Sequence, residues 1–403
     1  MKTAVLVAPF FQENTLRYLA ELAKLPETRA VVISQDAATR IPEALRAQVD
    51  GHFRVDDCLD GGQLAEACRK IGHVDRVLGV LEQLQLPIAI ARERCGIEGM
   101  WREAARNFRD KAVMKDVLRA HDLPCARHKL VESDGDAWQL IAEVGYPIIL
   151  KPVDGLGSRG TYRIRNDEEL RQALKGLKPS IDRPLQAEEF VTGEENTFET
   201  VTIHGKPVWH SGTHYLPGPL EVLENPWMQY CVVLPREANQ GEFKAFIPTN
   251  TAALAALGME TGLSHMEWFL RADGRACISE VGARPPGVQI MPMMSIAHDT
   301  DMIANWTRLM VHDQFEPVTR KFAVGAAFFR GQGKGSRVLA VHGIAQANEE
   351  VGAYVVDRLL PRAGQSAASS YEGEGWAIVK ADDTKTVMHA LKRLISLVRV
   401  ELG

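Results

Sequence analysis

The sequence has 403 residues, of which 45% are hydrophobic and 25% charged, enough for two or three domains with buried cores. A net charge of −5 with both signs mixed along the chain argues against a nucleic-acid surface or a polybasic membrane patch. No apolar run reaches the roughly 18–20 residues of a membrane helix, and six scattered cysteines show no zinc spacing, so we expect a cytoplasmic protein with reduced thiols.

The first 108 residues alternate short apolar runs with helix-like stretches. Strands are expected at residues 4–8, 30–34 and 76–80, and helices at 13–25 and 62–71. This alternation is typical of a parallel α/β sheet. The segment from Pro9 to Gln12 follows the first strand, so the glycine-rich fingerprint of a dinucleotide-binding fold is missing. We expect a Rossmann-like domain that serves as a scaffold and helps to bind substrate.

The remaining sequence divides into a central and a C-terminal region. A charged helix is expected at residues 110–121, and an apolar, methionine-rich stretch at 289–310 predicts one packed helix. From residue 316, the sequence predicts strands at 322–328, 352–356 and 376–380 and a closing helix at 385–398. Asp382, Asp383 and Thr384 are expected to cap that helix.

The first chemical motif is a lysine at a strand end followed by a glycine-rich loop. An apolar strand reaches Lys151, and a second strand begins near Thr161. The loop between them contains Gly155, Gly157, Ser158 and Gly160. Glycines let the backbone approach phosphate oxygens, and a lysine supplies a point charge. The motif predicts a phosphate cradle between two strands, although alone it is also typical of an ordinary β-turn loop.

The second motif is an acidic strand end. An apolar strand reaches Glu188, Glu189 and Val191, and Glu195 follows seven positions after Glu188. Backbone groups exposed at such a strand end can pair with an adenine edge, and a carboxylate can accept hydrogen bonds from ribose hydroxyls. By itself the pattern also fits a solvated acidic turn.

The third motif is a predicted β-hairpin that turns at Asp273 and Gly274. Glu267 and Glu280 lie six residues before and after this turn, so a two-residue loop places them opposite each other on one face. Two facing carboxylates repel unless a cation lies between them, and the strands themselves offer no positive partner. The motif predicts a site for a hard divalent ion that also binds phosphate oxygens.

Two further residues flank this hairpin motif. Arg284, four residues after Glu280, is placed to meet a phosphoryl oxygen. His265 is interpreted as a packing residue that points to the opposite face of the strand from Glu267.

In this order the three motifs resemble the ATP-grasp superfamily, in particular its biotin-carboxylase-like branch, which includes L-amino-acid ligases. The resemblance covers roughly residues 75–290. It implies an α/β protein with the ATP-grasp fold and with α+β structure in the ATP-binding part. The implied domains are an N-terminal α/β domain (1–108), an ATP-grasp domain (109–315) with a small lid at about 123–190, and a C-terminal α+β domain (316–403).

The resemblance implies roles for the motif residues. The implied ATP-binding residues are Lys111, Lys151, Gly155, Gly157, Ser158, Gly160, Glu188, Glu189, Val191 and Glu195. Lys151 and Arg284 are implied to act in catalysis, and Glu267 and Glu280 are implied ligands of Mg²⁺, for which Mn²⁺ can substitute. Gly282 departs from the common pattern, in which an Asn two residues after the second metal-binding Glu completes the site.

The substrate site is defined less closely. The segment with His214 and Tyr215 is interpreted either as a wall of the acceptor site or as a surface loop without a role. Gly287 is expected at the pocket floor. Glu82 follows a strand at a place where relatives contact the amino group of a bound amino acid or the domain interface.

The implied activity is ATP-dependent ligation of a carboxylate to an amine through an acyl phosphate. Such phosphoryl transfer needs positioning and charge neutralisation rather than a protein nucleophile. Two alternatives stay open: a carboxylase-like or formate-activating enzyme with the same ATP site, and a nucleotide-binding protein without turnover. The implied partners are small-molecule carboxylates and amines, amino acids above all, and a homodimer is the common state among relatives.

Overall fold

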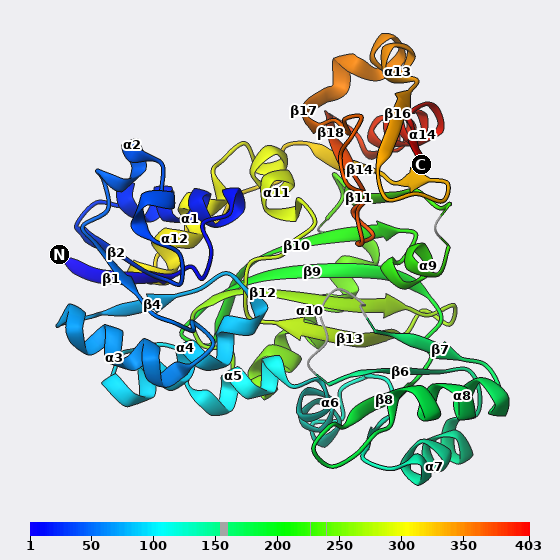
Figure 1. Ribbon diagram of the computed structural model, residues 1–403, viewed down its shortest axis with the longest axis horizontal. Coiled ribbons are helices and arrows are strands. Elements are labelled where there is room, and N and C mark those ends of the chain that lie inside the picture. The colour runs from blue at the N-terminus through cyan, green and yellow to red at the C-terminus, as the bar shows by residue number, and fades with distance from the viewer. Residues whose placement is uncertain (154–159, 226, 239) are drawn as a thin grey trace.

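The computed structural model describes residues 1–153, 160–225, 227–238 and 240–403. In these residues the strands form four sheets, and helices pack against them (Figure 1). The N-terminal part, the small sheet and the C-terminal part surround a central eight-stranded sheet, so three regions of the chain face one middle layer.

The N-terminal sheet is parallel, with strand order β3-β2-β1-β4. Its strands are β1 (Lys2–Val7), β2 (Thr28–Ser34), β3 (Gly51–Arg54) and β4 (Arg76–Leu78). The helices of this part are α1 (Glu13–Lys24), η1 (Ala38–Arg40), α2 (Glu43–Arg46), α3 (Gly61–Ile71), η2 (Glu82–Leu84) and α4 (Gln85–Cys95). The predicted parallel α/β sheet is confirmed. Strands β1 and β2 read as continuous apolar runs because both of their faces are covered.

A small antiparallel sheet with order β5-β8-β6-β7 forms a separate layer, with its own apolar core. Its elements are β5 (His128–Val131), α7 (Asp134–Val144), β6 (Ile148–Pro152), β7 (Tyr162–Ile164), α8 (Asp167–Leu177) and β8 (Leu185–Glu189). Two helices, α5 (Arg102–Arg109) and α6 (Lys111–Ala120), lead into it from the N-terminal part. Lys151 therefore lies at the end of β6, beside β8.

The central sheet is antiparallel, with order β13-β12-β9-β10-β11-β14-β18-β17. Its strands are β9 (Glu194–Ile203), β10 (Lys206–Leu216), β11 (Tyr230–Leu234), β12 (Gly262–Leu270), β13 (Ala276–Gly282), β14 (Ala323–Phe329), β17 (Val355–Leu359) and β18 (Gly375–Ala381). Helices α9 (Pro219–Glu224) and α10 (Gly241–Leu257) belong to the same region. Because β14, β17 and β18 extend this sheet, hydrogen bonding continues across the domain boundary predicted after residue 315.

The rest of the C-terminal region packs onto the end of the central sheet (Figure 1). It contains β15 (Gly331–Gln332), β16 (Val338–His342), α13 (Ile344–Val351), η3 (Gly352–Tyr354), α14 (Thr384–Leu397) and β19 (Arg399–Leu402). The strand predicted at 352–356 begins later, because a short helical turn occupies residues 352–354. Asp383 caps α14, as predicted.

The single helix predicted at residues 289–310 is wrong. The segment forms two helices, α11 (Ile290–His298) and α12 (Met302–His312). Asp299 takes a left-handed conformation with φ of 54° and ends α11, and the Asp301 side chain accepts hydrogen bonds from two backbone N–H groups at the start of α12. The break falls at the polar residues Asp299, Thr300 and Asp301, which interrupt an otherwise apolar stretch, and both helices bury their apolar faces in the same core.

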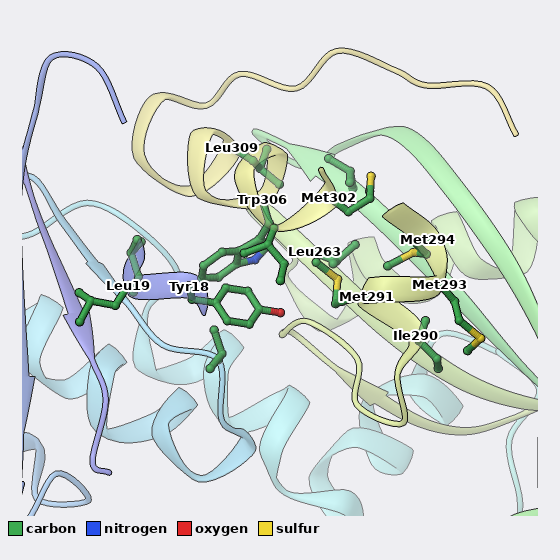
Figure 2. Close-up of a cluster of buried hydrophobic side chains, with 14 of the residues drawn as sticks. Tyr18, Leu19, Leu263, Ile290, Met291, Met293, Met294, Met302, Trp306 and Leu309 are labelled. Carbon is green, nitrogen blue, oxygen red and sulfur yellow. The ribbon is translucent and has the colours of Figure 1, made fainter. Parts of the chain in front are cut away.

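That core joins the N-terminal sheet to the central sheet. Figure 2 shows Met291, Met294 and Met302 of α11 and α12 gathered beside Leu263 of β12. The ring of Tyr18 on α1 meets the ring of Trp306 on α12 edge to face, with centroids 5.1 Å apart. The two parts of the molecule are therefore packed against each other through one apolar cluster.

The six cysteines are free thiols in the structure, and four of them are buried. Within the residues described, no helix has the length and apolar character needed to span a membrane.

Candidate active site

A cavity of about 120 Å³ opens where the small sheet faces the central sheet. We call it the lysine pocket. Its charged lining residues are Lys111, Lys115, Lys151, Glu188, Glu189, Glu195, Glu267 and Glu280. Its other lining residues include Ala126, Ile149, Phe190, Val191, Leu220 and Phe269. The lining thus combines apolar side chains with lysines that pair with carboxylates.

Two lysines hold the carboxylate of Glu188. Lys151 Nζ lies 2.5 Å from Glu188 Oε1, and Lys115 Nζ lies 3.4 Å from Glu188 Oε2. Gln186 Nε2 also donates to Glu188 Oε1, at 2.7 Å. Burial raises the pKa of Glu188, but Lys115 and Lys151 outweigh it and lower that pKa. Burial also lowers the pKa of Lys151, which Glu188 offsets in part. The side chain of Glu188 is therefore engaged by lysines. That its backbone groups pair with the adenine edge stays a prediction.

Lys111 pairs with the carboxylate of Glu280. The side chain of Asp110 accepts hydrogen bonds from two backbone N–H groups and so fixes the start of α6. The first residue of α6 is Lys111. Its ammonium group donates to Glu280 Oε1. Burial raises the pKa of Glu280, but Lys111 and then Lys151 outweigh this effect and lower the pKa to about 2. The positive partner that the strands lack is thus supplied by a helix far away in sequence.

Glu267 and Glu280 lie directly opposite each other on β12 and β13, as predicted. The predicted two-residue loop is wrong, because Leu270 pairs with Ala276 and the connection covers residues 271–275. A β-bulge at Ser279 restores the register. The Ser279 carbonyl accepts a hydrogen bond from Lys115 Nζ at 3.0 Å.

The expected orientation of His265 is also wrong. Residues i and i+2 of a strand share a face, so His265 lies on the same side of β12 as Glu267, with Nε2 3.6 Å from Glu267 Oε1. Its Nδ1 lies 2.8 Å from Glu199 Oε1. Burial lowers the pKa of His265, but the carboxylates of Glu199 and Glu267 outweigh it and raise the pKa to about 9.

A second cavity of about 160 Å³ adjoins the lysine pocket. We call it the arginine cavity. It is lined by Tyr215, Pro219, His265, Glu267, Glu280, Gly282, Arg284, Gly287, Val288, Tyr371 and Glu372. Glu267 and Glu280 line both cavities, so the two carboxylates stand at the junction between them. Arg284 Nε donates to Glu82 Oε2 at 2.5 Å, which brings Glu82 behind the wall of this cavity.

Of the two adjacent residues predicted near the substrate, only Tyr215 lines the arginine cavity. Its hydroxyl lies 3.5 Å from Glu267 Oε1. His214 points to the other face of β10, where its Nδ1 lies 2.7 Å from Asn196 Oδ1 and its ring contacts Phe243. The placement of His214 in the substrate site is therefore corrected, because neighbouring side chains of a strand alternate between faces.

The described residues include only part of the glycine-rich loop. Gly155, Gly157 and Ser158 lie outside the described residues, while Gly160 is described and has a left-handed φ of 70°. Glu195 lies inside the lysine pocket, where burial and then Glu267 raise the pKa of its carboxyl group. Its role toward a ribose stays a prediction.

Three residues of the site were missed in the sequence. Lys115 follows Lys111 by four positions, and this helical spacing places both on one face, so a signal for Lys115 was present. Tyr371 and Glu372 come from the segment before β18 and reach the arginine cavity through the order of strands in the central sheet. No local pattern marks them.

The carboxylates suit a metal ion that is shared with a ligand. Among the residues that the structure describes, no group of three or more His, Cys, Asp or Glu side chains could hold a metal ion. Glu267 and Glu280 offer hard oxygen atoms from two facing strands. This donor set fits Mg²⁺, which commonly binds one or two carboxylates and takes its other ligands from phosphates and water.

Comparison with known proteins agrees with this geometry. Residues 116–288 match the ATP-grasp domain family, and the matched range includes Lys151, Glu267 and Glu280. The chain contains an ATP-grasp domain. Over its whole length the chain shares its fold with an L-amino acid ligase from Bacillus licheniformis, which superposes with a TM-score of 0.78 at 18% identity and covers 100% of this chain and 99% of that one.

Curated relatives share part of this sequence. D-alanine–D-alanine ligase of Acinetobacter baylyi is 30% identical over 135 residues, which are 34% of this chain and 40% of that ligase. Alanine–anticapsin ligase of Bacillus subtilis is 25% identical over 251 residues, which are 57% of this chain and 52% of that ligase. The chain thus spans about half or less of the curated relatives it matches.

Proposed function

We propose that the protein is an ATP-dependent carboxylate–amine ligase that forms an acyl phosphate and then an amide or peptide bond. One observation carries this proposal: Glu267 and Glu280 line both the lysine pocket and the arginine cavity. A nucleotide in the first cavity would present its terminal phosphate at these carboxylates, and a substrate carboxylate in the second cavity would face that phosphate.

The lining of the lysine pocket suits both the base and the phosphates of ATP. The apolar side chains, among them Ile149, Leu220 and Phe269, fit the faces of a purine base. Lys111 and Lys151 also line the pocket, where their ammonium groups now pair with Glu280 and Glu188. Phosphate oxygens would take the place of these carboxylates as partners, so the lysines neutralise the charge of the triphosphate.

The chemistry then follows from position and charge. An oxygen of the substrate carboxylate attacks the γ-phosphorus of ATP, ADP leaves, and the resulting acyl phosphate is displaced by an amine with release of phosphate. Glu267 and Glu280 would hold Mg²⁺, which neutralises phosphate charge when it is bound. Arg284 lines the arginine cavity beside them, and its guanidinium group would steady the transferred phosphoryl group.

Amino acids are the proposed substrates. The named relatives join D-alanine to D-alanine, alanine to anticapsin, or L-amino acids. A cavity of about 160 Å³ with an arginine and several carboxylates has the polar lining that a small zwitterion needs.

A matrix of carboxylates and amines tests this function. Purified protein is incubated with ATP and Mg²⁺, or Mn²⁺ in a parallel series, and phosphate release and product mass are read for each pair. We expect phosphate release that depends on an added amino acid and a product of the mass of the amide. Release that depends on bicarbonate or formate alone would support the carboxylase-like alternative. Nucleotide binding without any release would support the inactive alternative.

Glu280→Gln tests the assignment of the metal-binding carboxylates. Loss of one negative oxygen at the phosphoryl-transfer site should lower amine-dependent ADP formation by roughly 100-fold or more. Glu349→Gln on the exposed surface of α13 is the matched control and should keep wild-type turnover. Unchanged turnover in Glu280→Gln, with native unfolding behaviour in both variants, would rule out this carboxylate as a metal ligand.

A further inference from the structure

The C-terminal region contributes an unpaired carboxylate to the arginine cavity. The other charged residues that line this cavity each have a partner of opposite charge: His265, Glu267, Glu280 and Arg284. Glu372 has neither a hydrogen bond nor an ion pair with any residue that the structure describes. Burial raises the pKa of its carboxyl group, as expected for a half-buried acid that lacks a cation beside it.

The segment that carries Glu372 is held in place by its neighbours. Gly373 has a φ of 68°, and a Cβ atom there would lie 2.5 Å from the Phe329 carbonyl oxygen, so only glycine lets the segment approach β14 this closely. The buried Glu374 accepts hydrogen bonds from the N–H groups of Gly331 and Ala368, at 2.5 and 2.8 Å. The backbone around Glu372 is therefore held by its neighbours, while the Glu372 carboxylate itself makes no hydrogen bond within the described part of the chain.

Aromatic rings stand beside this carboxylate. The ring of Tyr371 meets that of Tyr230 edge to face at 5.3 Å, and Tyr230 contacts Tyr215 at 5.9 Å. Tyr371 and Tyr215 both line the cavity. The hydroxyl of the fully buried Tyr230 has no hydrogen-bond partner in the described part of the chain. Burial, then Tyr371 and the carboxylates of Glu195, Glu267 and Glu372, raise its pKa, so this hydroxyl lies among the acids of the site.

A free carboxylate next to aromatic rings is suited to a cation. The rings attract a positive charge through their faces, and a charged hydrogen bond to a carboxylate is among the stronger polar contacts in proteins. Glu82, the other acid considered for an amino group, already pairs with Arg284 at 2.5 Å. Glu372 is thus the acid of this cavity that is open to a ligand.

We propose that Glu372, with Tyr371 beside it, binds the ammonium group of the amino acid whose carboxylate is activated, and so selects amino acids over simple carboxylic acids. This inference rests on the proposed function. The activated amino acid keeps its own amino group protonated throughout the reaction, whereas the attacking amine must be neutral. A carboxylate can therefore hold the first group without blocking the chemistry.

The test compares amino acids with their des-amino analogues. L-Alanine is paired with propanoate and L-leucine with 4-methylpentanoate, and hydroxylamine replaces the second substrate so that the acyl phosphate is trapped as a hydroxamate. In Glu372→Gln we expect KM for the amino acids to rise roughly 10- to 100-fold, with a smaller change in kcat and an unchanged KM for the analogues. Glu372→Asp keeps the charge and should restore part of the preference.

The controls separate a binding role from a structural one. KM for ATP should stay at the wild-type value in Glu372→Gln, and Glu349→Gln should match the wild type throughout. An equal rise in KM for amino acids and analogues, or no change for either, would overturn the role of Glu372. A wild-type protein that forms no hydroxamate from any amino acid but binds ATP would instead overturn the proposed function, and this inference with it.

Discussion

Gly282 stands where the common ATP-grasp pattern has an asparagine, and its surroundings show why a side chain is absent. A Cβ atom at this position would lie 3.2 Å from Glu82 Oε2 and 3.5 Å from Arg284 Cγ. The ion pair between Glu82 and Arg284 thus occupies the space next to Gly282. In place of a further metal ligand, the site has an arginine fixed in position by a buried carboxylate.

Gly282→Ala should therefore disturb the position of Arg284. A contact of 3.2 Å is tight for a methyl group, so the Glu82 carboxylate must shift by a few tenths of an ångström, and Arg284, with which it pairs, shifts with it. Since misplacement of a catalytic group by about 1 Å can cost roughly 100-fold in rate, we expect this smaller shift to lower kcat for phosphate release by up to about tenfold. Gly176→Ala, at an exposed and open position in α8, is the matched control and should leave kcat unchanged. Equal kcat values in the two variants would contradict this account.

The hairpin of β12 and β13 shows how two local irregularities combine in one element. The connection is longer than a two-residue turn. Without a further irregularity, this longer connection would place Glu267 opposite Ser279. The bulge at Ser279 adds the compensating residue, so Glu267 and Glu280 face each other after all. The predicted pairing is therefore correct although the predicted loop is not, because the longer connection and the bulge shift the register by one residue in opposite directions.

The break between α11 and α12 depends on a helix cap. Asp301 accepts hydrogen bonds at 2.9 Å from the N–H groups of Ile303 and Ala304. Asp301→Ala removes both bonds and should lower the free energy of unfolding by about 1 kcal/mol, measured by urea unfolding. Asp382→Ala removes an exposed aspartate next to, but not at, the cap of α14 and should change stability by less than about 0.5 kcal/mol. A stability loss of the same size in both variants would speak against the cap.

At the scale of the whole molecule, several histidines are fully or partly buried. The pKa of each of the following is lowered, with burial as the largest cause: His52, His128, His214, His298 and His312. His298 lies at the end of α11, where its ring meets the ring of Trp209 at 5.1 Å. Burial, and then Arg320, lower its pKa to about 4.

The protein should therefore lose stability as the pH falls below about 6.5. A histidine with a folded pKa of about 4, against the ordinary value of 6.5, binds its proton earlier in the unfolded chain. Unfolding is thus favoured by about 1.4 kcal/mol per pH unit, or roughly 3 kcal/mol by pH 4. Urea unfolding between pH 7.5 and 4.5 measures this slope. His298→Asn should flatten it, while His342→Asn at an exposed site should not; parallel curves for all three proteins would refute the assignment.

The sequence alone determined the features that rest on short-range patterns. Alternating apolar runs predicted the parallel N-terminal sheet, and the three ordered motifs predicted which lysines and carboxylates would meet. Lys151, Glu188, Glu267 and Glu280 do meet in one pocket, because each lies at a strand position that its own neighbours in sequence specify.

Only the tertiary structure decided which distant residues complete the site. Lys111 neutralises Glu280 from a helix 169 positions earlier in the chain, and Glu372 reaches the arginine cavity because β14 and β18 extend the central sheet. The physical reason is that sheet order and packing bring these side chains together over long sequence separations. Periodicity and motif spacing report on neighbours along the chain, whereas the charge balance of a buried site depends on every group that surrounds it in space.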